Sequence, residues 1–283
     1  MRAPLRRPPA ADAPATQFAT LALAGRDVRL EYAWVGSARA DAPLVVFLHE
    51  GLGSLAMWKD YPGALCAAAG VRGLVFSREG YGRSTPRPSG ERWPVDFMHR
   101  QAHTVLPALF AHLGIRAWPW LIGHSDGGSI ALLYAAAYPD RVAGVIAVAP
   151  HLFVEDVSVR SIDAARAAYE ATDLRARLAR YHADPDSAFW GWNDIWLDPA
   201  FRDWNIEAAL PAIRCPVLAV QGEDDEYGTM AQVEGVARLV PQARLVKLPA
   251  CGHSPHRDQP AALTAAVVAF LRQHGIGEVA GPR

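Results

Sequence analysis

Residues 123–127 read Gly-His-Ser-Asp-Gly, which is a G-x-S-x-G pattern with Ser125 at its centre. The pattern follows the apolar run 118–122 and precedes a helix-like stretch at 128–138, so it falls at a predicted turn from a strand into a helix. Such a turn is too tight for side chains on its flanks, and glycines there let the serine adopt a strained, exposed conformation. Strain of this kind is typical of positions that present a nucleophile. Ser125 is therefore the predicted nucleophile.

A serine hydroxyl is a weak nucleophile near neutral pH, so it needs a histidine base, and the base needs a carboxylate that orients it. His253 follows the apolar run 243–248 and is the predicted base. Asp225 follows the run 216–220 and is the predicted acid, which gives the chain order serine, acid, histidine. Neighbouring residues are alternatives for these roles: His256 for the base, and Asp224 and Glu226 for the acid. Glu155 and Asp156, which follow the run 142–148, are further alternatives for the acid.

Attack on a carbonyl also needs hydrogen-bond donors that stabilise the charge on its oxygen. The backbone N–H of Asp126, next to the nucleophile, is one candidate donor. The other is the backbone N–H of Gly51, in the loop 49–54 that follows the apolar run 44–48. Two glycines in this loop allow its backbone to approach a substrate closely. The sequence therefore predicts an oxyanion hole formed by Gly51 and Asp126.

The elements that must position these residues alternate between short apolar runs and helix-like segments. Segments 20–23 and 28–34 alternate in polarity around a Gly-Arg-Asp turn and predict an opening hairpin. The later runs are continuously apolar, which is typical of strands covered on both faces; they lie at 44–48, 73–76, 118–122, 142–148, 216–220 and 243–248. Helix-like stretches lie between them at 57–69, 96–113, 128–138, 230–240 and 259–274. The predicted fold is α/β, with a mostly parallel, doubly wound sheet.

Residues 152–210 interrupt this alternation, because they contain no apolar run of the strand type. They hold eleven acidic and six basic residues and four of the nine tryptophans. A helix is predicted at 158–181, followed by shorter segments that prolines interrupt. We predict that this insertion is a small α-helical cap over the sheet edge. The residues predicted to line the substrate pocket are Glu50, Leu52, Trp190, Trp192 and Trp196.

Length and composition fit one α/β domain with an insertion. The predicted core comprises 18–151 and 211–283, and residues 1–17, rich in Pro, Ala and Arg, are predicted as a disordered tail. A net charge of −1 over 283 residues lacks the basic excess of a nucleic-acid-binding protein. Three widely separated cysteines predict no disulfide framework and suit the cytoplasm. No stretch reaches the roughly 20 apolar residues of a membrane span, so no membrane partner is predicted.

These motifs resemble those of the α/β-hydrolase superfamily, in its serine-nucleophile branch. The resemblance runs from about residue 18 to the end and rests on FLHEG (47–51), GYGRS (80–84), GHSDG (123–127), GEDD (222–225) and GH (252–253). It looks most like the small capped carboxylesterases that cleave pimeloyl methyl esters, and the C–C bond hydrolases that act on ring-cleavage products. The resemblance implies catalysis without a cofactor or a metal. It also excludes the dehalogenases and epoxide hydrolases, whose nucleophile is an aspartate.

Two segments depart from the pattern of that superfamily. Glu50 stands where a glycine usually follows the histidine after the third strand, and Ser77-Arg78-Glu79 replaces the usual acidic-x-Arg approach to the Gly80 turn. Glu50 is expected to place a carboxylate beside the oxyanion hole. Such a charge would disfavour anionic acyl groups.

The sequence predicts a serine hydrolase that cleaves a small, largely apolar carboxylic ester through an acyl-enzyme on Ser125. Cleavage of a C–C bond in a diketone-type product, or of a thioester, would use the same residues and is the alternative among enzymes. A small-ligand-binding module is the alternative outside enzymes, although a receptor has no need of a complete set of serine, acid and histidine.

Overall fold

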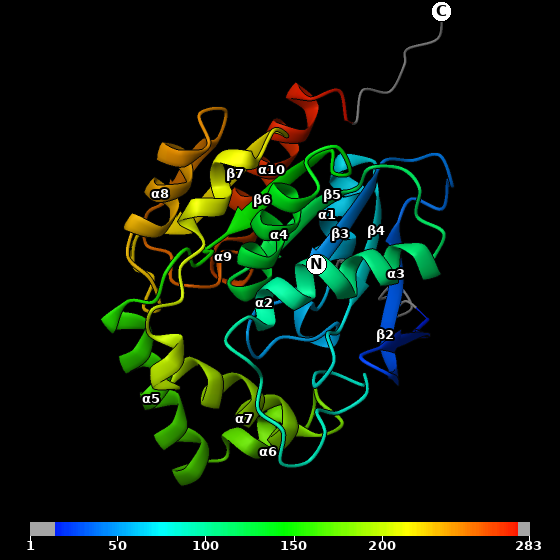
Figure 1. The fold of residues 1–283 in the computed structure, drawn as a ribbon. Coiled ribbons are helices and arrows are strands. Elements are labelled where there is room, and N and C mark those ends of the chain that lie inside the picture. Colours follow the sequence, from blue (N-terminus) through cyan, green and yellow to red (C-terminus); the bar gives the residue numbers. More distant parts are fainter. Residues whose placement is uncertain (1–14, 277–283) are drawn as a thin grey trace, which may run out of the picture.

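The computed structural model describes residues 15–276, and an eight-stranded sheet forms its centre (Figure 1). The strand order is β1-β2-β4-β3-β5-β6-β7-β8; β1 pairs antiparallel with β2, β2 pairs antiparallel with β4, and all other neighbours are parallel. The strands are β1 (Gln17–Leu23), β2 (Arg26–Gly36), β3 (Leu44–Leu48), β4 (Arg72–Phe76), β5 (Trp120–His124), β6 (Gly144–Val148), β7 (Val217–Gly222) and β8 (Arg244–Leu248). The predicted α/β fold with a mostly parallel sheet is confirmed.

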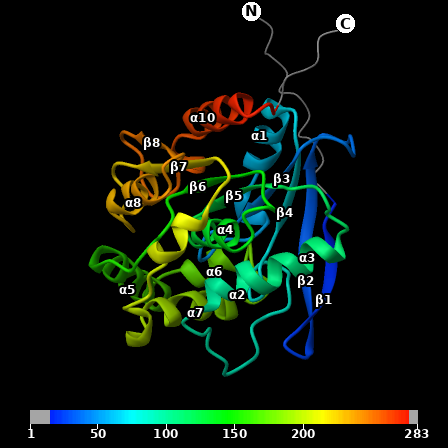
Figure 2. The ribbon, with the colours of Figure 1, turned by 45° about the horizontal axis from the view of Figure 1, so that its top comes forward.

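Helices cover both faces of this sheet, because successive residues of each strand point to opposite faces. Val45 and Phe47 of β3 belong to the core cluster that includes α1 and α10 on one face, whereas Val46 and Leu48 belong to the cluster that includes α2, α3, α4 and α8 on the other (Figure 2). The helices are α1 (Tyr61–Ala69), α2 (Phe97–Arg100), α3 (Leu106–His112), α4 (Asp126–Ala137), α8 (Ala231–Leu239), α9 (Pro255–Asp258) and α10 (Pro260–Gln273). A 3-10 turn (Ala56–Trp58) precedes α1, and a π-helical turn (Gln101–Val105) joins α2 to α3. Burial on both faces accounts for the continuously apolar runs.

Residues 152–210, here called the helical segment, contain no strand of the sheet. Their helices are α5 (Asp156–Ala171), α6 (Leu174–Leu178) and α7 (Pro185–Trp196), followed by 3-10 helices at Pro199–Phe201 and Glu207–Ala212. The single helix predicted at 158–181 is wrong, because α5 ends at an extended Thr172 whose hydroxyl donates to the carbonyl oxygen of Ala168 (2.6 Å). Helix α7 was not predicted, although Asp184 before Pro185 is a typical start signal: the Asp184 carboxylate accepts the Ser187 N–H (2.8 Å).

The two ends of the helical segment lie side by side. Phe153 forms an isolated antiparallel bridge with Asn205, and the N–H of Ile206 donates to the carbonyl oxygen of Leu152 at 2.7 Å. The segment therefore leaves the sheet after β6 and returns to nearly the same place before β7.

The start of the described chain lies in the sheet. Gln17 pairs with Tyr32, whose hydroxyl donates to the Gln17 side chain (2.8 Å), so the predicted tail 1–17 overlaps β1 by one residue. Residues 1–14 of that predicted tail lie outside the described residues. Among residues 15–276, no helix is both long and apolar enough to cross a bilayer.

Gly222 at the end of β7 is a point of close backbone contact, because a Cβ there would overlap the carbonyl oxygens of Cys251 and Gly252. We expect Gly222→Ala to lower the free energy of unfolding by about 1–3 kcal/mol, since the backbone must move. Gly63→Ala in α1 is the control: a Cβ there meets nothing within 4 Å, and the helix should gain up to about 1 kcal/mol. Urea unfolding followed by circular dichroism measures both changes. Equal effects of the two substitutions would contradict this account.

Candidate active site

Ser125 connects β5 to α4 with φ 53° and ψ −120°, a backbone conformation that residues other than glycine rarely adopt. The glycines around it are required sterically. A Cβ at Gly123 would overlap the backbone of Gly127, and a Cβ at Gly127 would overlap the carbonyl of Leu48. The backbone of the turn therefore packs directly against neighbouring backbone. Ser125 lines a cavity at this turn.

His253 and Asp225 form a hydrogen-bonded pair beside the same cavity. Nδ1 of His253 lies 2.8 Å and 3.0 Å from the two carboxylate oxygens of Asp225. Because an ionised carboxylate only accepts, Nδ1 carries the proton, and Nε2 of the neutral ring is free to act as a base. Burial raises the pKa of Asp225, but the bond from His253 and the N–H of Tyr227 (2.8 Å) outweigh it and leave this pKa below its ordinary value.

The alternative acids and the alternative base make other contacts. The Glu155 carboxylate accepts the Thr229 N–H (2.9 Å) and hydroxyl (2.6 Å), and Asp156 pairs with Arg202. Asp224 is exposed, whereas Glu226 accepts the backbone N–H of His253 (3.1 Å) rather than its ring. The ring of His256 packs against Trp58, with 4.9 Å between the centroids. Asp225 is the carboxylate that contacts the His253 ring.

The peptide between Glu50 and Gly51 has a fixed orientation. Its carbonyl oxygen accepts from Nδ1 of His49 (2.7 Å), Nη2 of Arg78 (2.8 Å) and the N–H of Gly53 (3.0 Å). In a planar trans peptide the N–H points opposite to the carbonyl, so the Gly51 N–H points away from these three donors. Gly51 lines the cavity, and the N–H of Asp126, in the first turn of α4, has no intrahelical acceptor.

Arg78 and Asp126 form a buried ion pair that the sequence analysis did not predict. Their side chains are 2% and 1% exposed, and Nη2 of Arg78 lies 3.5 Å from Oδ2 of Asp126. The other oxygen of Asp126 accepts the indole N–H of Trp196 in α7 at 3.2 Å. Burial raises the pKa of Asp126 above its ordinary value, although Arg78 and Trp196 oppose that shift. The residue after Ser125 thus connects the turn to β4 and to the helical segment.

The cavity has a volume of about 280 Å³. Four of the five residues predicted to line a substrate pocket border it: Glu50, Leu52, Trp192 and Trp196. Trp190 lies outside it and packs edge-on against Tyr169, with 5.5 Å between the ring centroids. The helical segment adds three apolar side chains that were not predicted, Ile162, Leu174 and Leu178.

His151 also lines this cavity and was missed at the level of sequence. It follows β6 at the same edge of the sheet and is 3% exposed. Its ring packs edge-on against Trp196, with 4.8 Å between the ring centroids. Burial, followed by repulsion from His253, lowers the pKa of His151 to about 3, so its ring is neutral near neutral pH. Its position just after the apolar run 142–148 was the signal that could have identified it.

Glu50 borders the cavity and lies between Arg257 and His124. One carboxylate oxygen lies 3.1 Å from Nη2 of Arg257, and the other lies 3.6 Å from Nδ1 of His124. Nε2 of His124 in turn donates to the carbonyl oxygen of His253 at 2.6 Å. Burial raises the pKa of Glu50, but His124 and Arg257 outweigh burial and leave this pKa well below its ordinary value.

The described residues do not gather three or more His, Cys, Asp or Glu side chains in a way that would hold a metal ion.

Fold and site together define a hydrolase of the α/β type, and comparison with known proteins gives the family. The model of the alpha/beta hydrolase family matches residues 45–267, which is most of the chain, and the chain belongs to this family.

The individual relatives share less than a third of their residues with this chain. The chain is 27% identical over 267 residues to a bifunctional esterase/perhydrolase of Acinetobacter calcoaceticus, covering 82% of this chain and 92% of the relative. A thermophilic esterase from Thermogutta terrifontis superimposes with a TM-score of 0.70 at 22% identity, covering 92% of this chain and 99% of the other. The enol-lactonase of Burkholderia xenovorans LB400 superimposes with a TM-score of 0.69 at 23% identity, covering 89% of this chain and 99% of the other. At this identity, the two structural likenesses establish the fold alone.

We expect Glu50→Gln to reduce stability in a pH-dependent way. Because the pKa of Glu50 is lower in the folded than in the unfolded chain, its ionised form stabilises the fold above the unfolded-state value of about 4.3. That stabilisation is lost as the pH falls towards the folded-state pKa. Urea unfolding should show the variant less stable by about 1–2 kcal/mol near neutral pH, with a smaller difference at about pH 3. A difference that grows on acidification would contradict the ionised state of Glu50.

Proposed function

We propose that the chain is a serine hydrolase that cleaves a small, largely apolar carboxylic ester through an acyl-enzyme on Ser125. The observation that carries the proposal is the Asp225–His253 pair, whose histidine borders the same cavity as a serine held at a strained strand-to-helix turn. The relative from Acinetobacter calcoaceticus, named as an esterase/perhydrolase, supports ester chemistry.

The chemistry follows from the roles of three groups. Oγ of Ser125 attacks the ester carbonyl while Nε2 of His253 takes its proton, and the N–H groups of Gly51 and Asp126 donate to the oxyanion. The C–O bond to the alcohol then breaks, and His253 gives its proton to the leaving oxygen. Water next attacks the acyl-enzyme and loses a proton to His253, which returns it to Ser125 as the acid leaves. Asp225 stays ionised and stabilises the protonated ring.

The substrate class follows from the cavity. Its volume of about 280 Å³ suits a small acyl group, and Leu52, Trp192 and Trp196 offer apolar walls. The helical segment acts as the cap in this proposal, because five of its residues border the cavity. The ionised Glu50 places a negative charge beside the predicted oxyanion hole, which disfavours anionic acyl groups.

Replacement of the nucleophile is the first test. We expect Ser125→Ala to lower the turnover of p-nitrophenyl acetate and butyrate on the order of 10⁶-fold, because no other hydroxyl occupies the turn. Ser89→Ala, at an exposed position, is the control and should match the wild type. A fluorophosphonate should add its phosphonyl group to the wild type and not to Ser125→Ala by intact mass. Residual turnover close to that of the wild type in Ser125→Ala would refute the proposal.

Replacement of the acid tests the second role. Asp225→Asn should reduce kcat by about 10⁴-fold, because the amide would favour the wrong tautomer of His253. Glu155→Gln removes an alternative acid whose carboxylate accepts from Thr229, and kcat should change less than about threefold. The comparison is made by the same p-nitrophenol assay. A larger loss of kcat in Glu155→Gln than in Asp225→Asn would assign the role of the acid to Glu155, in the loop after β6.

A further inference from the structure

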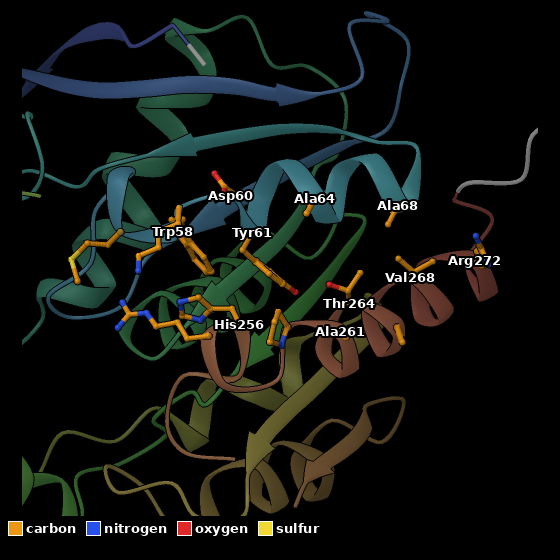
Figure 3. A pocket seen from close by; sticks show the side chains of 15 residues that line it. Trp58, Asp60, Tyr61, Ala64, Ala68, His256, Ala261, Thr264, Val268 and Arg272 are labelled. Carbon is orange, nitrogen blue, oxygen red and sulfur yellow. The ribbon is translucent and has the colours of Figure 1, made fainter. Parts of the chain in front are cut away.

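A second and larger cavity, of about 860 Å³, lies between α1 and α10 on the face of the sheet away from the helical segment (Figure 3). Four exposed alanines line it, two from each helix: Ala64, Ala68, Ala261 and Ala265. From Tyr61 to Ala68 the cavity follows α1 for about 10 Å. Small side chains on both walls leave an open, mostly apolar groove, here called the α1/α10 groove.

The α1/α10 groove adjoins the catalytic cavity. Met57 and Arg257 line both cavities, so these two side chains form the wall between them. Arg257 is 41% exposed and its only ion-pair partner among the described residues is Glu50. A ligand in the catalytic cavity could therefore extend into the groove by passing between Met57 and Arg257.

Two rings that line the end of the groove near the catalytic cavity, Trp58 and His256, are labelled in Figure 3 and are 3% and 5% exposed. Their buried ring nitrogens, Nε1 of Trp58 and both nitrogens of His256, have no hydrogen-bond partner among the described residues. Their rings pack together with 4.9 Å between centroids. An unpaired buried N–H is costly, and an oxygen acceptor on a bound molecule would remove that cost.

We propose that the α1/α10 groove binds the alcohol arm of the ester substrate, and this proposal rests on the proposed esterase function. His253 must lie next to the leaving oxygen, because it protonates that oxygen. The groove begins at His256 and Arg257, three and four residues beyond His253. The acyl group then occupies the smaller cavity beneath the helical segment. The arm that fits the groove is an aliphatic alcohol with an ether or hydroxyl oxygen near Trp58.

The test fills the groove without touching the catalytic residues. Ala64→Trp places an indole in the groove, and Ala67→Trp, exposed on the same helix but not in the groove, is the matched control. Rates of acid release from ethyl acetate and heptyl acetate are followed by titration, with p-nitrophenyl acetate as a general activity probe. In the wild type and in Ala67→Trp, kcat/KM should be at least about tenfold higher for heptyl than for ethyl acetate, because the longer chain buries more methylenes. In Ala64→Trp this preference should vanish.

The outcomes separate the two proposals. If p-nitrophenyl acetate is cleaved and Ala64→Trp keeps the preference of the control, the groove assignment is overturned while the esterase stands. If no ester is cleaved by any of the three proteins, both fail together. Loss of the preference in Ala64→Trp alone supports the groove as the alcohol site.

The oxygen on the alcohol arm has its own test. Butoxyethyl acetate has the same chain length as heptyl acetate and carries an ether oxygen that Trp58 could reach. We expect the wild type to favour butoxyethyl acetate over heptyl acetate about two- to tenfold in kcat/KM, and Trp58→Phe, which lacks the indole N–H, to cleave the two esters with equal kcat/KM. Equal rates for the two esters in the wild type would overturn this part of the proposal.

Discussion

The site is organised around the buried guanidinium of Arg78. It follows β4, donates to the carbonyl oxygen of Glu50, and pairs with Asp126 at the start of α4. Asp126 also accepts from Trp196, so one positive charge connects the loop 49–54, the turn that holds Ser125 and the helical segment. Breaking a buried pair of this kind leaves an uncompensated charge and costs about 3–5 kcal/mol. The geometry of the proposed site is therefore coupled to the stability of the fold.

His253 is held at three points. Its ring bonds to Asp225, its N–H donates to Glu226, and its carbonyl oxygen accepts from His124, the residue before Ser125. His124 is itself close to Glu50, so two carboxylate–imidazole pairs converge on one residue. These contacts fix both the backbone and the ring of His253, and such preorganisation would favour the proton transfer that we propose for it.

The sequence was sufficient for the sheet, because continuously apolar runs and a glycine-flanked serine are local signals. It was also sufficient for the pairing of His253 with Asp225, because both follow strands whose carboxyl ends meet at one edge. The partners of Arg78 were not predictable, because no local pattern links an arginine after β4 to a backbone carbonyl in one loop and a carboxylate in another. The tryptophans of α7 show a similar limit. Trp192 and Trp196, four residues apart, share the face towards the cavity, whereas Trp190 lies on the opposite side, and only knowledge of the helix separates them.

The joined ends of the helical segment have a consequence for how such a chain can change over evolutionary time. Because Phe153 pairs with Asn205 and Leu152 accepts from Ile206, the segment enters and leaves through one narrow stem. An insertion, deletion or exchange of residues between these points leaves the connections to β6 and β7 in place, whereas a change at Trp196 would remove its hydrogen bond to Asp126. The residues that the sheet positions can thus stay the same while the helical segment changes shape. Substrate selectivity can then evolve separately from the fold of the sheet.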